Sequence, residues 1–181
     1  RLYDITGIQQ LPFNTVYQIA ADRPQRLAAG ATLLLVPDLL GYCLTGVIAT
    51  DTTNASTTAL LDVRTREWSP EVVGVLGIPS AAFVAPDEPG VVRGHARDTA
   101  LDRMTLVGVA THDTASAFAG TPISDRDGAL VVSLGTWALV GAETAHHLPD
   151  ERARTLNLTH ELGVDGTVRV LRNAAGMWLL E

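Results

Sequence analysis

A stretch rich in glycine, proline, serine and aspartate over residues 120–128 divides the chain into two segments of similar character. These residue types favour turns and loops, so the stretch is the best candidate for a domain boundary. Short helix-like and strand-like segments occur on both sides of it. This mixture favours an α/β fold, which we expect to be split between parts of two domains.

In the first segment we expect three helices with recognisable ends. A two-piece helix over Asn14–Ala29 begins at a possible N-cap and is interrupted by Pro24. A second begins at Pro37, ends at Gly46, and presents an apolar face made of Leu39, Leu40, Cys43 and Leu44. A third runs from Ser69 to Gly77, followed by a proline-rich loop over Pro79–Gly90.

Strands are expected mainly in the later part of the chain, where β-branched residues cluster. A helix made mostly of small residues separates them and ends near Ala119. Another helix is expected to begin at Asn173. The expected strands are Leu60–Val63, Val91–Val92, Thr105–Ala110, Ala129–Ser133, Thr136–Gly141 and Thr167–Leu171.

Composition excludes several classes of function. All 13 basic residues are arginine, so the lysine of P-loop enzymes, Schiff-base enzymes and protein kinases is absent. A net charge of −7 without a basic run argues against nucleic-acid or anionic-membrane partners. No apolar run approaches the roughly 20 residues that span a bilayer. The single cysteine, Cys43, excludes an internal disulfide and leads us to expect a cytoplasmic location.

The sequence Thr111-His112-Asp113-Thr114 stands between an expected strand and an expected helix. Catalytic groups of α/β proteins cluster at such positions, where a carboxylate can accept a proton from a substrate hydroxyl group. The helix N–H groups can also orient an oxygen-rich ligand. The alternative is that Asp113 merely caps the helix.

Two further positions carry weaker signals. Ser133-Leu134-Gly135-Thr136 could bring backbone N–H groups and a hydroxyl to a phosphate, or it could be an ordinary hairpin turn. Asn173 could contact a ligand or simply cap a helix. The pair His146-His147 lacks the spacing of a metal site, and no residue is assigned as a metal ligand.

The order of these segments resembles the FGGY family of carbohydrate kinases almost from end to end. Histidine-aspartate-threonine and threonine-asparagine-alanine-serine are the most distinctive of the matching strings. The matching segments are Gly7–Ile19, Leu35–Gly46, Thr53–Ser56 with Leu60–Asp62 and Trp68, Thr111–Ser116, Ser133–Trp137 and Leu171–Leu180.

The resemblance implies two actin-like, ribonuclease-H-like domains with ATP and a sugar in the cleft between them. Residues 1–120 would be the later part of the N-terminal domain, on the sugar side. Residues 121–181 would begin the C-terminal domain, on the nucleotide side. The expected partners are therefore a small sugar, ATP with Mg²⁺, and the missing segments of a longer parent chain.

By the same resemblance, Asp113 would be the general base that accepts the proton of the attacking sugar hydroxyl. His112, Thr114 and Asn173 would bind the sugar beside it. Gly135 and Thr136 would hold ATP phosphate. Glu181 stands where related proteins tend to carry glutamine near the nucleotide, which puts that contact in doubt.

The expected reaction is phosphoryl transfer from ATP to C1 of the ketose L-rhamnulose. Another ketose, such as L-fuculose or xylulose, is the alternative within this class. A non-catalytic sugar-binding remnant is the alternative from a different class. We expect the present chain to be an internal piece that has no kinase activity on its own.

Overall fold

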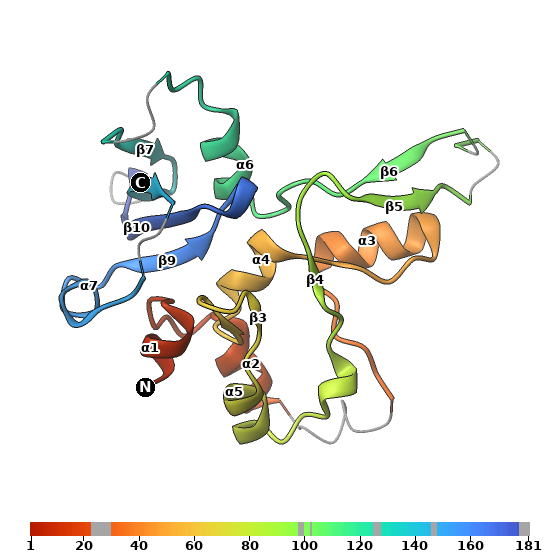
Figure 1. Cartoon of the computed structure of the whole chain (residues 1–181), viewed down its shortest axis with the longest axis horizontal. Coiled ribbons are helices and arrows are strands. Elements are labelled where there is room, and N and C mark those ends of the chain that lie inside the picture. The colour runs from red at the N-terminus through yellow and green to blue at the C-terminus, as the bar shows by residue number, and fades with distance from the viewer. Residues whose placement is uncertain (23–29, 98–99, 102, 125–127, 146–147, 178–181) are drawn as a thin grey trace.

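The computed structural model describes residues 1–22, 30–97, 100–101, 103–124, 128–145 and 148–177 (Figure 1). Helices and strands are interspersed along these residues, as expected for an α/β fold. The helices are α1 (Leu2–Thr6), α2 (Thr15–Ala21), α3 (Val36–Thr45), α4 (Thr52–Thr57), α5 (Pro70–Val75), η2 (Ser80–Ala82), α6 (Asp113–Gly120), α7 (Glu151–Thr155) and η3 (Val164–Gly166). The strands are β1 (Thr50–Asp51), β2 (Leu61–Asp62), β3 (Glu67–Trp68), β4 (Pro86–Asp87), β5 (Val92–His95), β6 (Thr105–Val107), β7 (Val131–Leu134), β8 (Trp137–Thr144), β9 (Thr159–Leu162) and β10 (Val168–Ala175).

An antiparallel four-stranded sheet in the order β7-β8-β10-β9 dominates the later part of the chain. The predicted β7–β8 hairpin is confirmed, but its turn lies at Gly135 and Thr136, one residue later than the predicted turn at Leu134 and Gly135, and Leu134 pairs with Ala138. In β10, the alternating residues Arg169, Leu171 and Asn173 share one face of the sheet. That face lies toward the first part of the chain and becomes one wall of the site.

The first part of the chain packs directly on this sheet. Helix α4 contacts β9, and the backbone N–H of Leu162 donates to Ser56 Oγ at 3.0 Å. Ala55, Leu61 and Val63 form an apolar cluster with Leu162 and Val168 of the sheet. Since the cluster draws residues from both sides of the stretch 120–128, burial of shared apolar surface holds the two segments together.

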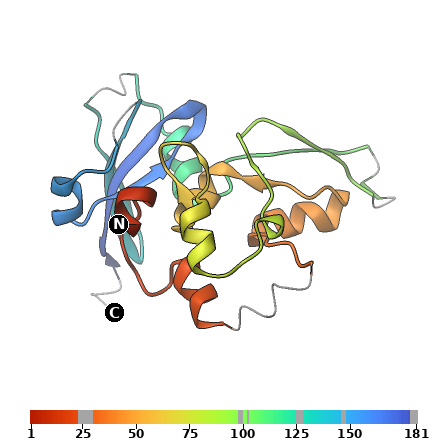
Figure 2. The same cartoon turned by 60° about the horizontal axis from the view of Figure 1, so that its bottom comes forward.

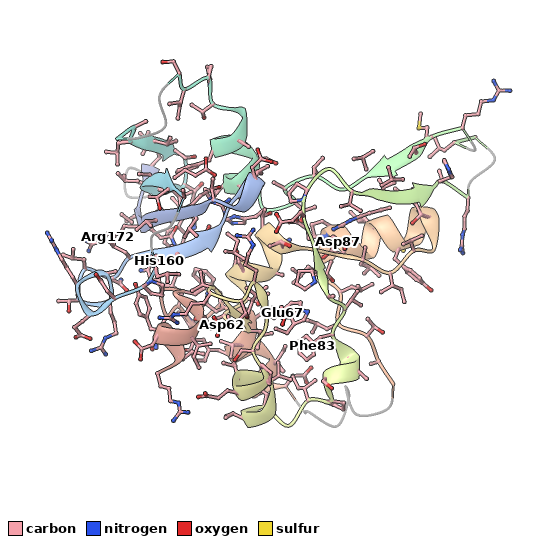
Figure 3. The ribbon with its side chains drawn as sticks, in the orientation of Figure 1. Asp62, Glu67, Phe83, Asp87, His160 and Arg172 are labelled. Carbon is pink, nitrogen blue, oxygen red and sulfur yellow. The ribbon has the colours of Figure 1, made fainter. Side chains whose placement is uncertain are left out.

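Helix α1 is bound to the same edge of the sheet, at β9. The N–H of His160 in β9 donates to the carbonyl of Gly7 at 2.8 Å, and the Tyr3 hydroxyl donates to the carbonyl of Leu158 at 2.8 Å. Figure 3 labels His160, which lies next to α1. Gly7 has a φ of 69°, and a Cβ atom there would lie 2.7 Å from His160 Cβ, so this close approach requires glycine.

Helix α3 lies beside the β5–β6 hairpin, which extends away from the rest of the molecule (Figures 1 and 2). The expected helix is confirmed, with Gly46 in the left-handed conformation at its end. Its apolar face is exposed, at Leu39, Leu40, Cys43 and Leu44. The helix meets β5 through its polar side instead, because Asp38 forms a buried ion pair with Arg93 of that strand.

Other local predictions have mixed outcomes. Helix α2 starts after Asn14, and α5 starts after Ser69, whose Oγ accepts the N–H of Val72. Residues 23–29, the second piece of the expected helix, lie outside the described residues. The proline-rich segment 79–90 is not all loop, since it contains η2 and β4.

The prediction that a helix begins at Asn173 is wrong. Asn173 lies inside β10 and pairs with Leu139 of β8. The two-residue alternation that starts at Val168 continues through it, and pairing with β8 along the whole of β10 prevails over the local capping preference.

Candidate functional site

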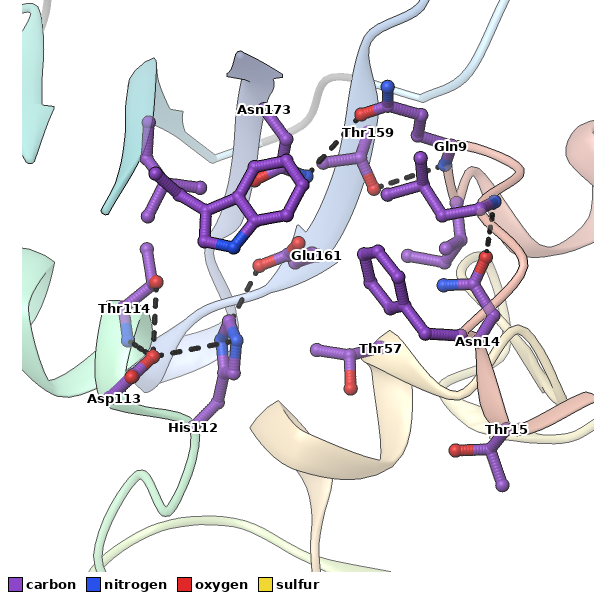
Figure 4. A pocket seen from close by; sticks show the side chains of 15 residues that line it. Gln9, Asn14, Thr15, Thr57, His112, Asp113, Thr114, Thr159, Glu161 and Asn173 are labelled. Atoms are coloured by element: carbon purple, nitrogen blue, oxygen red, sulfur yellow. Dashed lines mark hydrogen bonds and ion pairs between the residues drawn. The ribbon is translucent and has the colours of Figure 1, made fainter. Parts of the chain in front are cut away.

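A pocket of about 310 Å³ opens where the first part of the chain faces the four-stranded sheet (Figure 4). Four of the residues singled out from the sequence line it together: His112, Asp113, Thr114 and Asn173. Gly135 and Thr136 are not among the lining residues, although their neighbour Trp137 is. The remaining lining residues are Ile8, Gln9, Leu11, Phe13, Asn14, Thr15, Thr57, Leu139, Thr159 and Glu161.

His112, Asp113 and Thr114 sit at the beginning of α6. His112 occupies the N-cap position but makes no side-chain capping bond, and Asp113 is the first helical residue. Asp113 Oδ1 accepts the backbone N–H of Thr114 at 2.6 Å. The Asp113 side chain is nevertheless 97 % exposed, so its carboxylate remains accessible from the pocket.

A buried aspartate holds the loop that leads to these residues. Asp51 Oδ2 accepts the backbone N–H of Thr111 at 3.0 Å and its hydroxyl at 2.9 Å. The same oxygen caps α4 by accepting the N–H of Asn54 at 2.9 Å and the hydroxyl of Thr53 at 2.5 Å. One carboxylate therefore ties α4 to the start of α6.

Asp51 is in turn positioned by the ion pair beneath α3. Its backbone N–H donates to Asp38 Oδ1 at 3.2 Å, and Arg93 Nη1 donates to the same oxygen at 2.8 Å. Burial raises the pKa of Asp38 above its ordinary value, while the hydrogen bond from Arg93 acts in the opposite direction. This polar scaffold lies entirely outside the pocket lining and was not anticipated from the sequence.

Asn173 reaches the pocket from the opposite wall. Its Nδ2 donates to Gln9 Oε1 at 3.3 Å, and the Gln9 N–H donates to Thr159 Oγ1 at 3.3 Å. These bonds join the loop after α1 to β9 and β10, as Figure 4 shows. Amide and hydroxyl groups of this kind can both donate and accept hydrogen bonds, which suits a ligand rich in hydroxyl groups.

Glu161 and Arg169 are site residues that the sequence reasoning missed. They are cross-strand neighbours in β9 and β10, and Arg169 Nη2 donates to Glu161 Oε2 at 3.1 Å. Glu161 lines the pocket, and Arg169 lies behind it with no exposed side-chain surface. The alternation in residues 168–175 could have placed Arg169 and Asn173 on one face. No pattern in the sequence around Glu161 indicated that this residue would line the pocket.

Apolar side chains line another part of the pocket. Phe13 from the first part of the chain meets Trp137 of β8 edge to face, with ring centroids 6.1 Å apart. Ile8, Leu11 and Leu139 extend this apolar surface. The pocket thus has both hydrogen-bonding and apolar walls, the usual character of a small-molecule site.

Backbone hydrogen bonds hold the turn at Gly135 and Thr136 in place. The carbonyl groups of these two residues accept the N–H groups of Met177 and Gly176, at 2.8 and 3.1 Å. The Gly135 N–H already donates to the carbonyl of Trp137 at 2.8 Å. A Cβ atom at Gly135 would meet only that carbonyl oxygen, at 3.9 Å, so the outer side of the turn is open.

The described residues contain no group of three or more histidine, cysteine, aspartate or glutamate side chains that could hold a metal ion. The search for membrane spans, over those same residues, finds no helix with the length and apolar character to cross a bilayer. His146, His147 and Glu181 lie outside the described residues.

Comparison with protein families gives one match. Residues 1–120 match the N-terminal domain of the FGGY family of carbohydrate kinases. Among curated proteins, the rhamnulokinase of Enterococcus faecalis is 44 % identical over 186 residues, which cover 100 % of this chain. The rhamnulokinase of Yersinia pestis is 44 % identical over 99 % of the chain. The chain spans only 37 % and 38 % of the lengths of these two relatives.

Solved structures of sugar and polyol kinases share the fold. The Plasmodium falciparum glycerol kinase with ADP superposes with a TM-score of 0.84 at 19 % identity, covering 99 % of this chain and 39 % of that one. The Rhodospirillum rubrum xylulose kinase superposes with a TM-score of 0.80 at 20 % identity, covering 99 % and 38 %. The expected actin-like, ribonuclease-H-like fold is confirmed.

Proposed function

The chain belongs to the FGGY family of carbohydrate kinases, and from that premise we propose that the protein transfers the γ-phosphoryl group of ATP to a hydroxyl group of a ketose. The observation that carries this proposal is the pocket itself. Four residues chosen from the sequence alone, His112, Asp113, Thr114 and Asn173, converge there from α6 and β10. A carboxylate, an imidazole, a hydroxyl and an amide form a set suited to a polyhydroxylated ligand.

Asp113 is proposed as the general base. A base must lie within about 2.6–3.2 Å of the hydroxyl that it deprotonates, so its carboxylate must be open to the ligand. The Asp113 side chain meets that condition, being 97 % exposed at the pocket. His112, Thr114 and Asn173 would hold the sugar, which keeps the reacting hydroxyl next to the base. Phosphoryl transfer depends chiefly on such positioning.

Gly135 and Thr136 are proposed to contact ATP phosphate. Their turn is open on its outer side and rigidly held underneath, as a phosphate platform must be. Since the Gly135 N–H is engaged by Trp137, the Thr136 hydroxyl would supply the hydrogen bond. Mg²⁺ would neutralise charge on the phosphates. Magnesium commonly binds one or two carboxylates plus phosphate oxygens, so it requires no dedicated cage of protein ligands here.

L-Rhamnulose, phosphorylated on C1, is the ketose we propose. Two curated relatives at 44 % identity carry the name rhamnulokinase. The apolar wall around Phe13 and Trp137 also suits the methyl group of a deoxyketose. L-Fuculose, another deoxyketose, is the second candidate, while xylulose lacks the methyl group that this wall would contact.

We further propose that residues 1–120 and 121–181 belong to the N-terminal and C-terminal domains of a longer cytoplasmic kinase. The 181-residue chain alone should show no kinase activity, because it spans only 37 % of a curated relative. A non-catalytic sugar-binding remnant is the alternative. Determining the flanking coding sequence separates the two, because an upstream aspartate-glycine-threonine phosphate loop favours the kinase and stop codons favour the remnant.

The central test is turnover by the full-length protein on a panel of ketoses. L-Rhamnulose should give the highest kcat/KM. The variant Asp113→Asn should lose at least about 10²-fold in kcat, as expected for removal of a general base, while sugar affinity stays nearly unchanged. Asp165→Asn is the matched control, since Asp165 is exposed and is not among the residues that line the pocket. Substantial turnover by Asp113→Asn would refute the assignment of the base.

A further inference from the structure

Arg169 is a buried cation that the proposed reaction leaves unexplained. Its side chain has no exposed surface and lies on the sheet face behind the pocket. Its charge is balanced by Glu161, with Nη2 and Oε2 3.1 Å apart. Arginine is almost never fully buried without a partner, and an apolar residue would pack there at lower desolvation cost. The arginine therefore calls for a role beyond packing.

The second contact of the same Arg169 nitrogen reaches His112. Nη2 lies 3.3 Å from His112 Nδ1. A guanidinium group can only donate hydrogen bonds, so Nδ1 must be the unprotonated nitrogen that accepts. The proton of a neutral imidazole then resides on Nε2. One hydrogen of Nη2 thus goes to Glu161 and the other goes to His112.

A competing arrangement has Nδ1 protonated and donating to Glu161 Oε2, 3.5 Å away. That distance is longer than the contact with Arg169, and Nδ1–H would face a group that has only donors. The charged groups recorded around His112 in the described part of the chain are Arg169 of β10, Glu161 of β9 and Asp113 of α6.

The other edge of the His112 ring faces the ligand space. Nε2 lies 3.8 Å from Asp113 Oδ1, which is too far for a direct hydrogen bond. Both residues line the pocket, and Figure 4 shows His112 between Asp113 and Glu161. An Nε2–H group at this position would be available to an oxygen atom of a bound molecule beside the carboxylate.

We propose that Arg169, anchored by Glu161, holds His112 as the neutral Nε2–H tautomer and so makes it a hydrogen-bond donor to a ligand oxygen next to Asp113. The identity of that ligand as a ketose rests on the proposed function. In that reaction His112 would bind a sugar oxygen adjacent to the hydroxyl that Asp113 deprotonates. Arg169 and Glu161 are positioning residues that act through the imidazole.

Nitrogen NMR of the full-length protein, labelled with ¹⁵N-histidine, tests the tautomer directly. The chain contains five histidines, and His112→Gln identifies the signals of the residue of interest. The expected pattern for His112 is a protonated Nε2 and an unprotonated, strongly downfield Nδ1. A protonated Nδ1 in the wild-type protein at neutral pH would overturn the proposal. This measurement requires no variant that alters the buried pair.

The variant Arg169→Met tests whether Arg169 is what determines the tautomer of His112. Without the guanidinium, Nδ1–H can donate to Glu161, so the tautomer should reverse. Arg172→Met is the matched control, because Arg172 is exposed on the same strand and should leave the His112 signals unchanged. If Arg169→Met fails to fold, the double variant Arg169→Met with Glu161→Leu removes both charges. It should leave His112 as a mixture of tautomers. Retention of a pure Nε2–H tautomer in either folded variant would refute the role of Arg169.

Kinetics separates this inference from the proposed function. In an active kinase, Arg169→Met should raise the KM for the ketose by roughly 3- to 10-fold, the effect of one lost hydrogen bond. If the wild-type protein phosphorylates no ketose but His112 carries its proton on Nε2, the proposed function fails and the tautomer assignment stands. An active kinase whose His112 is protonated on Nδ1 refutes the tautomer assignment alone.

Discussion

Replacing Asp51 by alanine should cost far more stability than the loss of a helix cap. Asp51 caps the six-residue helix α4, and capping residues contribute about 1 kcal/mol. Its Oδ2 also accepts two hydrogen bonds from Thr111, and each bond to a charged group contributes at least about 1.5 kcal/mol. The expected loss in the free energy of unfolding is therefore about 4 kcal/mol.

Urea denaturation of Asp51→Ala, compared with a second cap variant, isolates the part that comes from Thr111. Ser69→Ala is the matched control, because Ser69 is also buried and caps the six-residue helix α5 through one bond to Val72. Ser69→Ala should lose about 1 kcal/mol. In a thermal scan the two variants should differ by roughly 6–12 °C.

A double-mutant cycle tests whether the extra loss of stability in Asp51→Ala comes from its bonds to Thr111, in the loop before α6. Thr111→Val removes the hydroxyl bond, so the combination of Asp51→Ala with Thr111→Val should lose less than the two single variants together. If Asp51→Ala costs no more than Ser69→Ala, Asp51 does no more than cap α4. The reasoning that it holds the start of α6 would then be refuted.

Three further predictions concern the scaffold. Burial raises the pKa of Tyr3 to about 12, so stability present below pH 10 should be lost as the pH rises toward 12. Ultraviolet titration should accordingly show one of the three tyrosines ionising near pH 12, and ionisation of all three near pH 10 would contradict this. Asp38→Ala leaves buried Arg93 unpaired and should cost about 3–5 kcal/mol in urea denaturation, whereas Asp38→Leu with Arg93→Met should recover most of that loss. A Cβ atom at Gly141 would overlap atoms of the neighbouring strand β10, so Gly141→Ala should abolish the soluble folded protein. A Cβ atom at Gly120 would meet open space, so Gly120→Ala should change the free energy of unfolding by less than about 1 kcal/mol in circular dichroism melts.

The elements that were predictable from the sequence are those with local signals. The start of α6 near Asp113 and the hairpin turn at Gly135 each follow from a few adjacent residues. The end of α3 at Gly46 follows in the same way, from a glycine at positive φ. Such features depend on backbone conformation over one turn, so distant parts of the chain have little influence on them.

Features that depend on tertiary pairing were not predictable in this way. The apolar face of α3 is visible in the sequence, but its exposure is not, because the ion pair between Asp38 and Arg93 turns the polar side of the helix toward β5. Asn173 carries a helix-capping signal, but its pairing with Leu139 of β8 retains the residue in the sheet. Glu161 lines the pocket from β9, a place that depends on the pairing of β9 with β10 and not on the residues next to it in the sequence.

The roles of the candidate site residues rest on the resemblance rather than on spacing. In isolation Asp113 could have been a simple cap, and the structure makes it the first helical residue with an open carboxylate. Convergence with Asn173, 60 positions later in the chain, required the intervening segment to fold back, which no local pattern encodes. The order of motifs was informative because the family shares that fold.

The fastening of α1 to the sheet also determines when the pocket can form during synthesis. Tyr3 bonds to the carbonyl of a residue 155 positions later, and Gly7 bonds to His160. At about 5–20 residues per second, a ribosome needs roughly 8–30 s to make the intervening chain. Throughout that interval the wall that contains Gln9 and Phe13 lacks its partner strands. The pocket is therefore assembled late, and its earlier-made wall is open to chaperones for many seconds.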